Sequence, residues 1–497
     1  MTQATCDFVF DPDEWEAEHE TQCTLEEELL EDGCWHCHRR VSDGTDYCVF
    51  HRSPEETNST RVSRAFQSAI QNIGNTDSAG NIAQSRRFIG ARIANLSLSY
   101  ADLGRGSNHP IDLRYATIED SLNLEQATVA ANLLLEGSRI NEINAHGCTF
   151  ENRVDATGTE VDTVDFRSAT FYGRVNLHLI EIKRGKLFNA KFKERAIFRG
   201  ATIRETFSAK KACFEADTSF SKSTFENKSS FAEAVFCGDA SFKDINIESP
   251  LSLSEIEVKS EFQFDPDSVA ADVNRIDLTE SHIEDGYIRY PLDSDVKLDL
   301  SRATVGTVTI GTQASTVELQ RFRFIETEFK GFDFSKYTDT LVRRNWLLHS
   351  LPNANDEYVL KNAPRYPFVS RFWKGYLTIR MELLFEAEFT PGELRSTYLK
   401  AKNGAKEVGD NSAAAEFFLH EMRYKRKSYA QAFKNHHSGR ALYQWLSNWG
   451  YNIAAGYGER PFRTFLFSIL LIGAFSIGYL MLAPLSVVPI GSEVSQN

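Results

Sequence analysis

Large apolar residues recur every five or six positions through the middle of the chain. Between residues 214 and 242 the steps are 6, 5, 6, 5 and 6. Five residues turn an α-helix through about 500°, so no single helical face collects these side chains. An odd step in a strand moves the side chain to the other face of the sheet. We therefore predict a chain that turns a corner about every five residues, with each large residue pointing inward. The ladder here comprises Phe214, Phe220, Phe225, Phe231, Phe236 and Phe242.

A set of small residues accompanies this ladder. A small residue stands two positions before many of the large ones, as in Ala234 and Phe236. Residues two apart in an extended segment share one face, so both point inward while the polar residues between them face solvent. Cys148, Cys213 and Cys237 lie on or near the small positions and are predicted to be packing residues.

The ladder and the segment ANLSLSYADLG resemble pentapeptide-repeat proteins. The resemblance covers residues 86–335 and implies a mainly β fold, a right-handed quadrilateral β-helix. It is weaker over 104–112 and 266–291, where loops or irregular coils are expected. At about four repeats per coil and about 4.8 Å between stacked strands, the implied rod is roughly 55–60 Å long. The six-residue steps predict coils slightly wider than the strict family pattern.

One long apolar segment stands near the C-terminus. From Thr464 to Ser492 there is no Asp, Glu, Lys, Arg or His. A helix needs about 20 apolar residues to cross the hydrocarbon of a bilayer, and Phe462–Leu482 supplies them. A signal peptide is excluded by position, and a buried core helix is the alternative. We predict one transmembrane helix at about 462–482 that contacts membrane lipid.

The basic residues near this segment all precede it. Positively charged flanks stay on the cytoplasmic side of a membrane. The expected location is therefore the cell membrane, with a single pass, the bulk of the chain cytoplasmic and the C-terminus outside. The same charges suit anionic lipid headgroups, or they act only as a topology signal. They are Lys425, Arg426, Lys427, Lys434, Arg440, Arg460 and Arg463.

Gly456-Tyr457-Gly458 spells the core of a potassium-channel filter just before the span. A filter lies at membrane depth and needs a pore helix and two flanking spans around it. These three residues precede a single span, so we predict a juxtamembrane turn. The sequence EFFLHEMRYKRK and the following GYGERPFR resemble the linker of archaeal pentapeptide-repeat proteins with a two-span ion-channel domain. The pore helix, filter and second span of that family have no counterpart here.

A helical hairpin is predicted between the β-helix and the span. Thr390 and Glu393 have the spacing of a capping box, Pro391 suits the first helical position, and Gly409 suits a helix end. A second helix is expected over 412–427. The predicted seam comprises Leu394, Tyr398, Phe417, Phe418 and Met422. Two readings stay open for Tyr443, Trp445 and Trp449, which suit either the membrane interface or a helix core.

Four residues near the N-terminus have the spacing of a zinc knuckle, Cys34-x2-Cys37-x10-Cys48-x2-His51. With no secretion signal, cysteines are expected to be free thiols or metal ligands. The spacing predicts a closed, structural zinc site rather than a catalytic one; unliganded thiols are the alternative. The segment also resembles the N-terminal module of archaeal membrane pentapeptide-repeat proteins, in which an early cysteine accompanies the cluster. Cys6 is therefore an alternative ligand to Cys34, and spacing does not choose between them.

Charge and organisation complete the picture. The net charge is -14, and residues 1–38 hold twelve acids with no Lys or Arg. We predict an acidic segment with the Cys/His module at 1–60, a linker or helical cap at 61–85, and the β-helix at 86–335. An α-helical connector follows at 336–455, and the turn, span and short tail occupy 456–497.

The leading functional hypothesis is a membrane-anchored scaffold that binds protein partners on its β-helix. No P-loop, dinucleotide fingerprint or Ser-His-Asp set stands out, so an enzyme is not expected. One alternative is an accessory subunit or relic of an ion channel. Another is a DNA mimic that binds topoisomerases, as some acidic rods of this family do. The predicted rod has 39 acids and 30 bases, a mild excess, and nucleic acid itself is not an expected partner.

Overall fold

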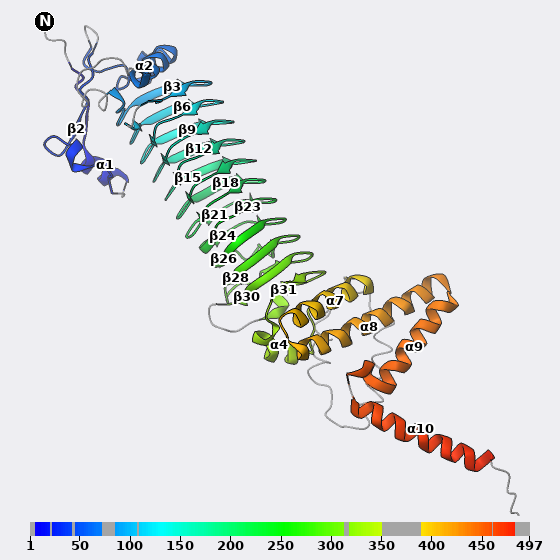
Figure 1. Ribbon diagram of the computed structural model, residues 1–497. Helices are drawn as coiled ribbons and strands as arrows, with labels where there is room; N and C mark the ends of the chain where they lie inside the picture. The colour runs from blue at the N-terminus through cyan, green and yellow to red at the C-terminus, as the bar shows by residue number, and fades with distance from the viewer. Residues whose placement is uncertain are drawn as a thin grey trace, which may run out of the picture. The chain divides into compact units, whose positions relative to one another are not determined.

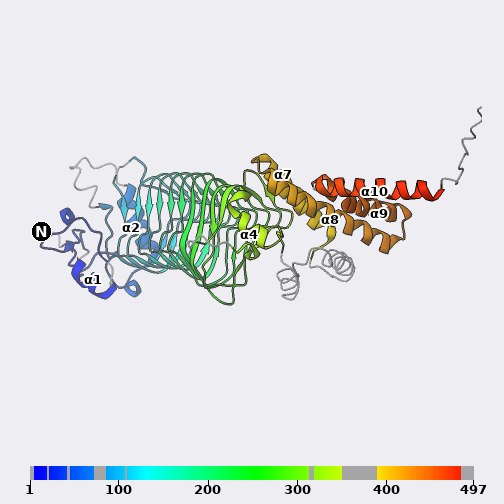
Figure 2. The ribbon, with the colours of Figure 1, turned by 90° about the horizontal axis from the view of Figure 1, so that it is seen from below.

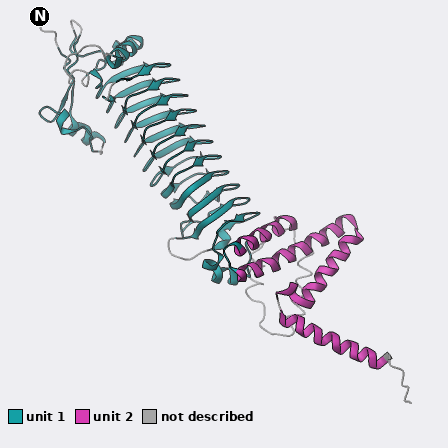
Figure 3. Cartoon of the chain, in the orientation of Figure 1, with its two compact units in different colours: residues 1–350, 407–410 teal, residues 351–406, 411–497 magenta. Residues whose placement is uncertain are grey.

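The computed structural model describes residues 5–19, 22–41, 45–71, 85–106, 109–312, 318–349, 389–459 and 461–482. The chain divides into two compact units (Figure 3). Unit 1 comprises residues 1–350 and 407–410, and unit 2 comprises 351–406 and 411–497. The first residues of the predicted connector therefore belong with the β-helix. Three parts of the prediction lie outside the described residues: residues 72–84 of the linker or cap predicted at 61–85, residues 350–388 of the connector, and residues 483–497 of the tail.

Unit 1 is built around a β-solenoid, which confirms the predicted mainly β fold (Figures 1 and 2). One coil runs through β9 (Arg139–Asn144), β10 (Thr149–Phe150) and β11 (Val154–Asp155). The chain then reaches β12 (Glu160–Asp165), which pairs in parallel with β9. The two halves of each long strand and the two short strands make four sides, as a quadrilateral coil requires.

The other strands of the solenoid repeat this plan, with neighbouring sides merged into one strand in the later coils. Strands of three or more residues are β3 (Arg92–Ser97), β6 (Thr117–Asn123), β15 (Glu181–Lys186), β18 (Thr202–Ser208), β24 (Ala240–Ile247), β26 (Glu257–Val269), β27 (Arg275–Asp277), β28 (His282–Arg289), β29 (Lys297–Asp299) and β30 (Thr304–Gly311). Two-residue strands are β4 (Asp102–Leu103), β5 (Ile111–Asp112), β7 (Thr128–Val129), β8 (Leu133–Leu134), β13 (Thr170–Phe171), β14 (Val175–Asn176), β16 (Lys191–Phe192), β17 (Ala196–Ile197), β19 (Cys213–Phe214), β20 (Thr218–Ser219), β21 (Thr224–Phe225), β22 (Ser229–Ser230), β23 (Val235–Phe236), β25 (Leu251–Ser252), β31 (Phe322–Arg323) and β32 (Glu328–Phe329).

The strand register gives the length of each coil. Glu160 pairs with Glu181 and Thr202 with Thr224, so these coils contain 21 and 22 residues. Four strict pentapeptides make about 20, so the predicted widening is confirmed. Wider coils use more residues each, and about ten coils stack at about 4.8 Å. The rod is therefore about 48 Å long, shorter than the sequence predicted.

The phenylalanine ladder forms the core of the solenoid. Phe171, Phe192, Phe214 and Phe236 are 0% exposed. Their rings stack from coil to coil, with centroids 4.8 to 4.9 Å apart and interplanar angles of 2° to 7°. This spacing matches the distance between paired strands. Burying a phenylalanine side chain contributes about 1.5–3 kcal/mol, so the ladder accounts for a large part of the stability.

The three cysteines of the ladder region differ in burial. Cys148 is fully buried, as a packing residue should be, whereas Cys213 and Cys237 are half-buried.

The two stretches that were expected to be loops or irregular coils differ from each other in structure. The chain makes a long connection between β4 and β5, as expected. The expectation of loops over 266–291 is wrong in part, because β26 and β28 run through it. Pro266 fits within β26 because the register shifts beside its partner Ile245, and such bulges accommodate proline in a sheet.

Both ends of the solenoid are covered by elements of unit 1. Helix α2 (Ser59–Gln71) buries Val62, Phe66 and Ile70 at the N-terminal end, where the Phe66 ring lies 4.2 Å from that of Phe88. At the other end lie η3 (Leu319–Arg321), η4 (Phe334–Tyr337) and α4 (Thr338–Arg343). The N-terminal module contains β1 (Val9–Phe10), α1 (Pro12–His19), η1 (Glu27–Leu29), β2 (Trp35–His36) and η2 (Pro54–Glu56).

The described residues of unit 2 are mainly helical, and only the last residue of α7 falls in unit 1. The helices are α7 (Pro391–Glu407), α8 (Asn411–His436), α9 (Gly439–Ala455), η5 (Gly456–Gly458) and α10 (Pro461–Leu482). The capping box is confirmed: the Glu393 carboxylate accepts from the Thr390 amide at 2.8 Å, and Thr390 Oγ1 accepts from the Glu393 amide at 3.2 Å. Helix α8 extends well beyond the predicted residue 427.

The seam between α7 and α8 forms around Tyr398. Its ring stacks on His420 and Tyr424, with centroids 4.9 and 5.4 Å away. Of the predicted seam residues, Leu394, Tyr398 and Phe417 are buried, whereas Phe418 and Met422 are only half-buried. The residues of the Gly-Tyr-Gly sequence form η5, the predicted turn between α9 and α10.

Candidate metal centre

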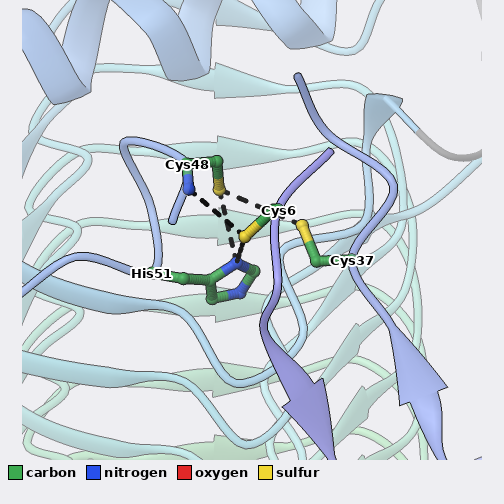
Figure 4. Close-up of side chains that lie close together, drawn as sticks. All are labelled: Cys6, Cys37, Cys48 and His51. Atoms are coloured by element: carbon green, nitrogen blue, oxygen red, sulfur yellow. Dashed lines mark hydrogen bonds between the residues drawn. The ribbon is translucent and has the colours of Figure 1, made fainter. Parts of the chain in front are cut away.

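Four potential metal ligands meet in the N-terminal module: Cys6, Cys37, Cys48 and His51 (Figure 4). All four are buried, and their ligand atoms lie within 4.8 Å of one another. His51 Nδ1 is 3.3 Å from the Cys48 sulfur and 3.6 Å from the Cys6 sulfur. The Cys37 and Cys48 sulfurs are 3.9 Å apart. Three thiols and an imidazole therefore converge on one point.

Two backbone arrangements bring these ligands together. Cys6 and Cys37 lie on antiparallel segments that continue the β1–β2 pair, where the Cys6 amide donates to Arg39 O at 2.8 Å and the Cys37 amide donates to Phe8 O at 3.1 Å. Cys48 and His51 lie on a tight turn, closed by the His51 amide donating to Cys48 O at 3.0 Å. The Cys48 amide also donates to the Cys6 sulfur at 3.2 Å, which joins the two halves.

Cys34 does not lie in this cluster. Its place as the fourth ligand is taken by Cys6, which the sequence offered as the alternative. Trp35 and His36 form the extended strand β2, so residues 34 and 37 point to opposite faces. Cys34 is half-buried near acidic side chains, and its pKa is raised by burial and then by the charges of Asp11, Asp13 and Asp32. That environment disfavours the thiolate that a metal requires.

His51 is held with one ring nitrogen toward the sulfurs. Its Nε2–H donates to the Ile89 carbonyl at 3.0 Å, which leaves Nδ1 as the atom that faces the Cys48 and Cys6 sulfurs. Metal-binding histidines commonly donate their second nitrogen in this way. The Phe8 ring stacks on the imidazole at 4.0 Å and 6°, which fixes its plane.

The pKa values of Cys6, Cys37 and His51 in the cluster are shifted far from their ordinary values. Hydrogen bonds from Cys37 and then Cys48 hold the pKa of Cys6 well below its ordinary value, and hydrogen bonds to Cys48 and Cys6 raise that of Cys37. Burial alone would lower the pKa of His51, but its hydrogen bonds to Cys48 and Cys6 raise it to about 9. Three close thiols do not all ionise without a cation between them, so this donor set fits a divalent metal.

A buried arginine, which sequence reasoning missed, lies beside the cluster. Burial lowers the pKa of Arg39, while the negative charges of Cys48, Cys37 and Cys6 raise it. Its guanidinium packs 4.7 Å from the centre of the Phe50 ring and 4.3 Å from that of Phe88. A divalent ion with three thiolates carries one net negative charge, which Arg39 is placed to offset. In the sequence, the only indication of this role for Arg39 is that a basic residue stands two positions after Cys37.

The module is joined to the first coil of the solenoid. The Arg92 amide donates to Phe50 O at 2.7 Å, in addition to the bond from His51 to Ile89. Gly90 has a positive φ of 66°, and a Cβ there would lie 2.6 Å from the Phe8 ring. The cluster thus holds together the segments that close the N-terminal end of the solenoid.

A groove runs along the outside of the solenoid, over β6, β9, β12, β15 and β18, with a volume of about 690 Å³. Ion pairs between neighbouring coils line this ion-pair groove. Arg139 contacts Glu160 at 2.8 Å, Lys183 contacts Asp162 at 2.7 Å, and Arg204 contacts Glu181 at 2.5 Å. Sequence reasoning placed partners on the solenoid surface without naming a face.

Among the described residues, one helix is long and apolar enough to cross a membrane. It covers Pro461–Met481, has a mean hydropathy of 2.0, and is 0% buried within the protein. This result agrees with the predicted apolar helix and with its predicted limits.

Comparison of the chain with family models, with curated proteins and with solved structures finds no match.

Proposed function

We propose that this chain is a non-enzymatic, membrane-anchored scaffold of the pentapeptide-repeat class. The observation that carries the proposal is a solenoid filled by its own side chains on the same chain as an apolar helix that no protein covers. A filled solenoid offers its outer faces for binding. An apolar helix of this length without protein cover is stable in lipid and not in water.

Zinc is the metal that we propose for the cluster. Thiolates and imidazole together favour Zn²⁺ over the hard cations, which take oxygen ligands. Four protein ligands close the coordination shell and leave no position for a substrate water. The ion therefore serves to hold the N-terminal module together, and Cys6, Cys37, Cys48 and His51 would hold it.

The anchor is tested by extracting membranes that contain the full-length protein with alkaline carbonate. We expect the protein to stay in the pellet. Leu471→Arg places a charge near the middle of α10, at a cost of about 2.5–3.5 kcal/mol, and is expected to move the protein toward the soluble fraction. Thr464→Arg is the matched control, because it adds the same charge near the basic end. Complete extraction of the unmodified chain would refute the anchor.

The scaffold is tested with full-length protein in vesicles as bait. We propose the ion-pair groove as the face for protein partners, because its charges alternate in sign and can be matched by a complementary surface. A partner bound by the unmodified chain should be lost with Arg139→Glu and Arg204→Glu together. It should be retained with Lys222→Glu and Lys243→Glu, which change the same charge away from the groove.

Two other results would replace the scaffold with a named alternative. Recovery of a two-span channel protein in equal amount would make the chain an accessory channel subunit. Inhibition of DNA supercoiling by the purified protein would make it a DNA mimic. A partner that binds both groove variants equally well would count against the groove.

A further inference from the structure

Helix α9, which precedes the apolar helix, has one face without protein cover. Tyr443, Leu446 and Ile453 are 72%, 47% and 48% exposed, and Trp449 is 38% exposed. At 100° per residue these four side chains lie within an arc of about 120°. Ala441, on the other side of the helix, is buried. We call the four exposed residues the α9 stripe.

The α9 stripe leads directly to the exposed apolar surface of α10. Both helices belong to unit 2, they contact each other, and α9 ends six residues before α10 begins (Figure 1). The turn between them is fixed by the buried Tyr457. Its hydroxyl donates to Asn448 Oδ1 at 2.7 Å and accepts from Arg426 at 3.1 Å. Helix α9 therefore stays close to the end of the span rather than moving freely.

The charge around α9 has one sign. Between Glu421 and Glu459 there is no acidic residue, whereas there are six basic ones. Lys434 and Arg440 are exposed at the two ends of the α8–α9 connection. Each such charge near an anionic membrane contributes about 1 kcal/mol of attraction. Tyrosine and tryptophan favour the layer between water and hydrocarbon.

We propose that α9 lies in the headgroup layer of an anionic phospholipid membrane, with the α9 stripe turned toward the lipid. The inference rests on the proposed membrane anchoring by α10 and adds to it a second lipid contact and a lipid class. An interfacial helix buries its apolar face about 5–10 Å into the headgroup boundary. The turn at η5 sets α9 at the level where α10 enters the bilayer. Of the three aromatic residues with two open readings, this placement assigns Tyr443 and Trp449 to the membrane interface because both face outward, whereas Trp445 is half-buried and lies outside the α9 stripe.

The test uses the full-length protein in vesicles of phosphatidylcholine, with or without phosphatidylglycerol. A fluorescent amino acid is placed at position 446, 447 or 475, and quenching by lipids labelled at the headgroup or deep in the acyl chain is measured. Ser447 is exposed but lies beside the α9 stripe, so it is the matched control for Leu446. We expect shallow quenching at 446 several-fold stronger than at 447, and deep quenching at Phe475.

The outcomes separate the two proposals. Deep quenching at 475 with equal, weak quenching at 446 and 447 would overturn the position of α9 and leave the anchor intact. No lipid quenching at 475 would mean that the anchor itself has failed. Self-quenching at 446 that rises with protein density, without lipid quenching, would assign the α9 stripe to a second copy of the chain.

Lipid class is tested with Lys434→Gln and Arg440→Gln together. In phosphatidylglycerol vesicles, shallow quenching at 446 should fall toward the value in phosphatidylcholine alone. The apolar contact remains, so some quenching should persist. Equal quenching at 446 in both kinds of vesicle for the unmodified protein would rule out the anionic lipid class.

Discussion

At the scale of single residues, the ligand set of the proposed zinc centre gives the sharpest prediction. Cys6→Ser removes a thiolate that points into the cluster, whereas Cys34→Ser changes a thiol outside it. We expect Cys6→Ser to lower zinc affinity by more than the 10–100-fold that loss of an outer-shell partner costs. Zinc per chain, measured by elemental analysis after equilibration with a competing chelator, should be near one for Cys34→Ser.

The opposite pattern would restore the knuckle spacing read from the sequence. If Cys34→Ser released zinc and Cys6→Ser retained it, the strand at β2 would have to bend in the metal-bound protein. Equal retention by both variants would show that three ligands and a water suffice, and the site would no longer be closed.

An ion pair between a buried aspartate and an exposed arginine of the solenoid gives a pH dependence. Burial would raise the pKa of Asp165, but hydrogen bonds and charge from Arg167 lower it below its ordinary value. Arg167 Nη2 lies 2.6 Å from the carboxylate. A lowered folded-state pKa means that this stabilisation is present above the ordinary value of 3.8 and is lost as the pH falls below it.

The corresponding variant is Asp165→Asn. At pH 7 it should reduce the free energy of unfolding by about 1 kcal/mol, since Arg167 is half exposed and remains solvated. The difference from the unmodified protein should shrink at pH 3, because the carboxyl group of the unfolded chain, with its ordinary pKa value of 3.8, is then mostly protonated. Urea unfolding followed by circular dichroism measures both values. The exposed Asp120→Asn is the control, and a deficit for Asp165→Asn that is equally large at both pH values would contradict the assignment.

At the scale of elements, the sequence predicted periodic features well and long-range choices poorly. The five- and six-residue steps determine the coil because every coil must bury its own large residue. The ligand set of the Cys/His cluster could not be predicted in the same way, because Cys34 and Cys6 are equally suitable as metal ligands. The choice depends on whether residues 34–37 turn or extend, and Trp35 selects the strand by packing inward, where it is 6% exposed. Spacing alone does not contain that tertiary contact.

The Gly-Tyr-Gly turn illustrates the same limit, and it yields a prediction. A turn was expected, but the role of Tyr457 as the buried link to Arg426 and Asn448 was not. Tyr457→Phe removes this partner from the buried Arg426 and from the half-buried Asn448, so unit 2 should lose about 1–3 kcal/mol of stability. Tyr443→Phe removes a hydroxyl from a side chain that is 72% exposed and should change stability by less than about 0.5 kcal/mol.

Helix loss on heating in detergent, followed by circular dichroism, compares the two tyrosine variants. A lower midpoint for Tyr457→Phe alone is the expected result. Equal midpoints would mean that water replaces the hydrogen bonds of the Tyr457 hydroxyl at no cost in stability. These hydrogen bonds would then not fix the turn between α9 and α10.

At the scale of the whole molecule, the proposed metal centre should affect the stability of the solenoid from one end only. Each coil contacts only its neighbours, so stability is passed along the stack and depends on a covered end. The N-terminal end is covered by the module that the cluster holds together, through His51 and Phe50. Removal of the metal by a chelator should therefore open the solenoid from that end.

Hydrogen exchange measured by mass spectrometry detects this direction. After metal removal we expect faster exchange in β3 and β6, a smaller change in β9 and β12, and none in β28 and β30. Readdition of zinc should restore protection in the same coils. The matched control is Cys34→Ser, which should respond to the chelator as the unmodified protein does, whereas Cys6→Ser should exchange rapidly at β3 before any chelator is added. Uniform loss of protection along all coils would show that the solenoid unfolds as one unit, and unchanged exchange at β3 would show that the end is covered without the metal.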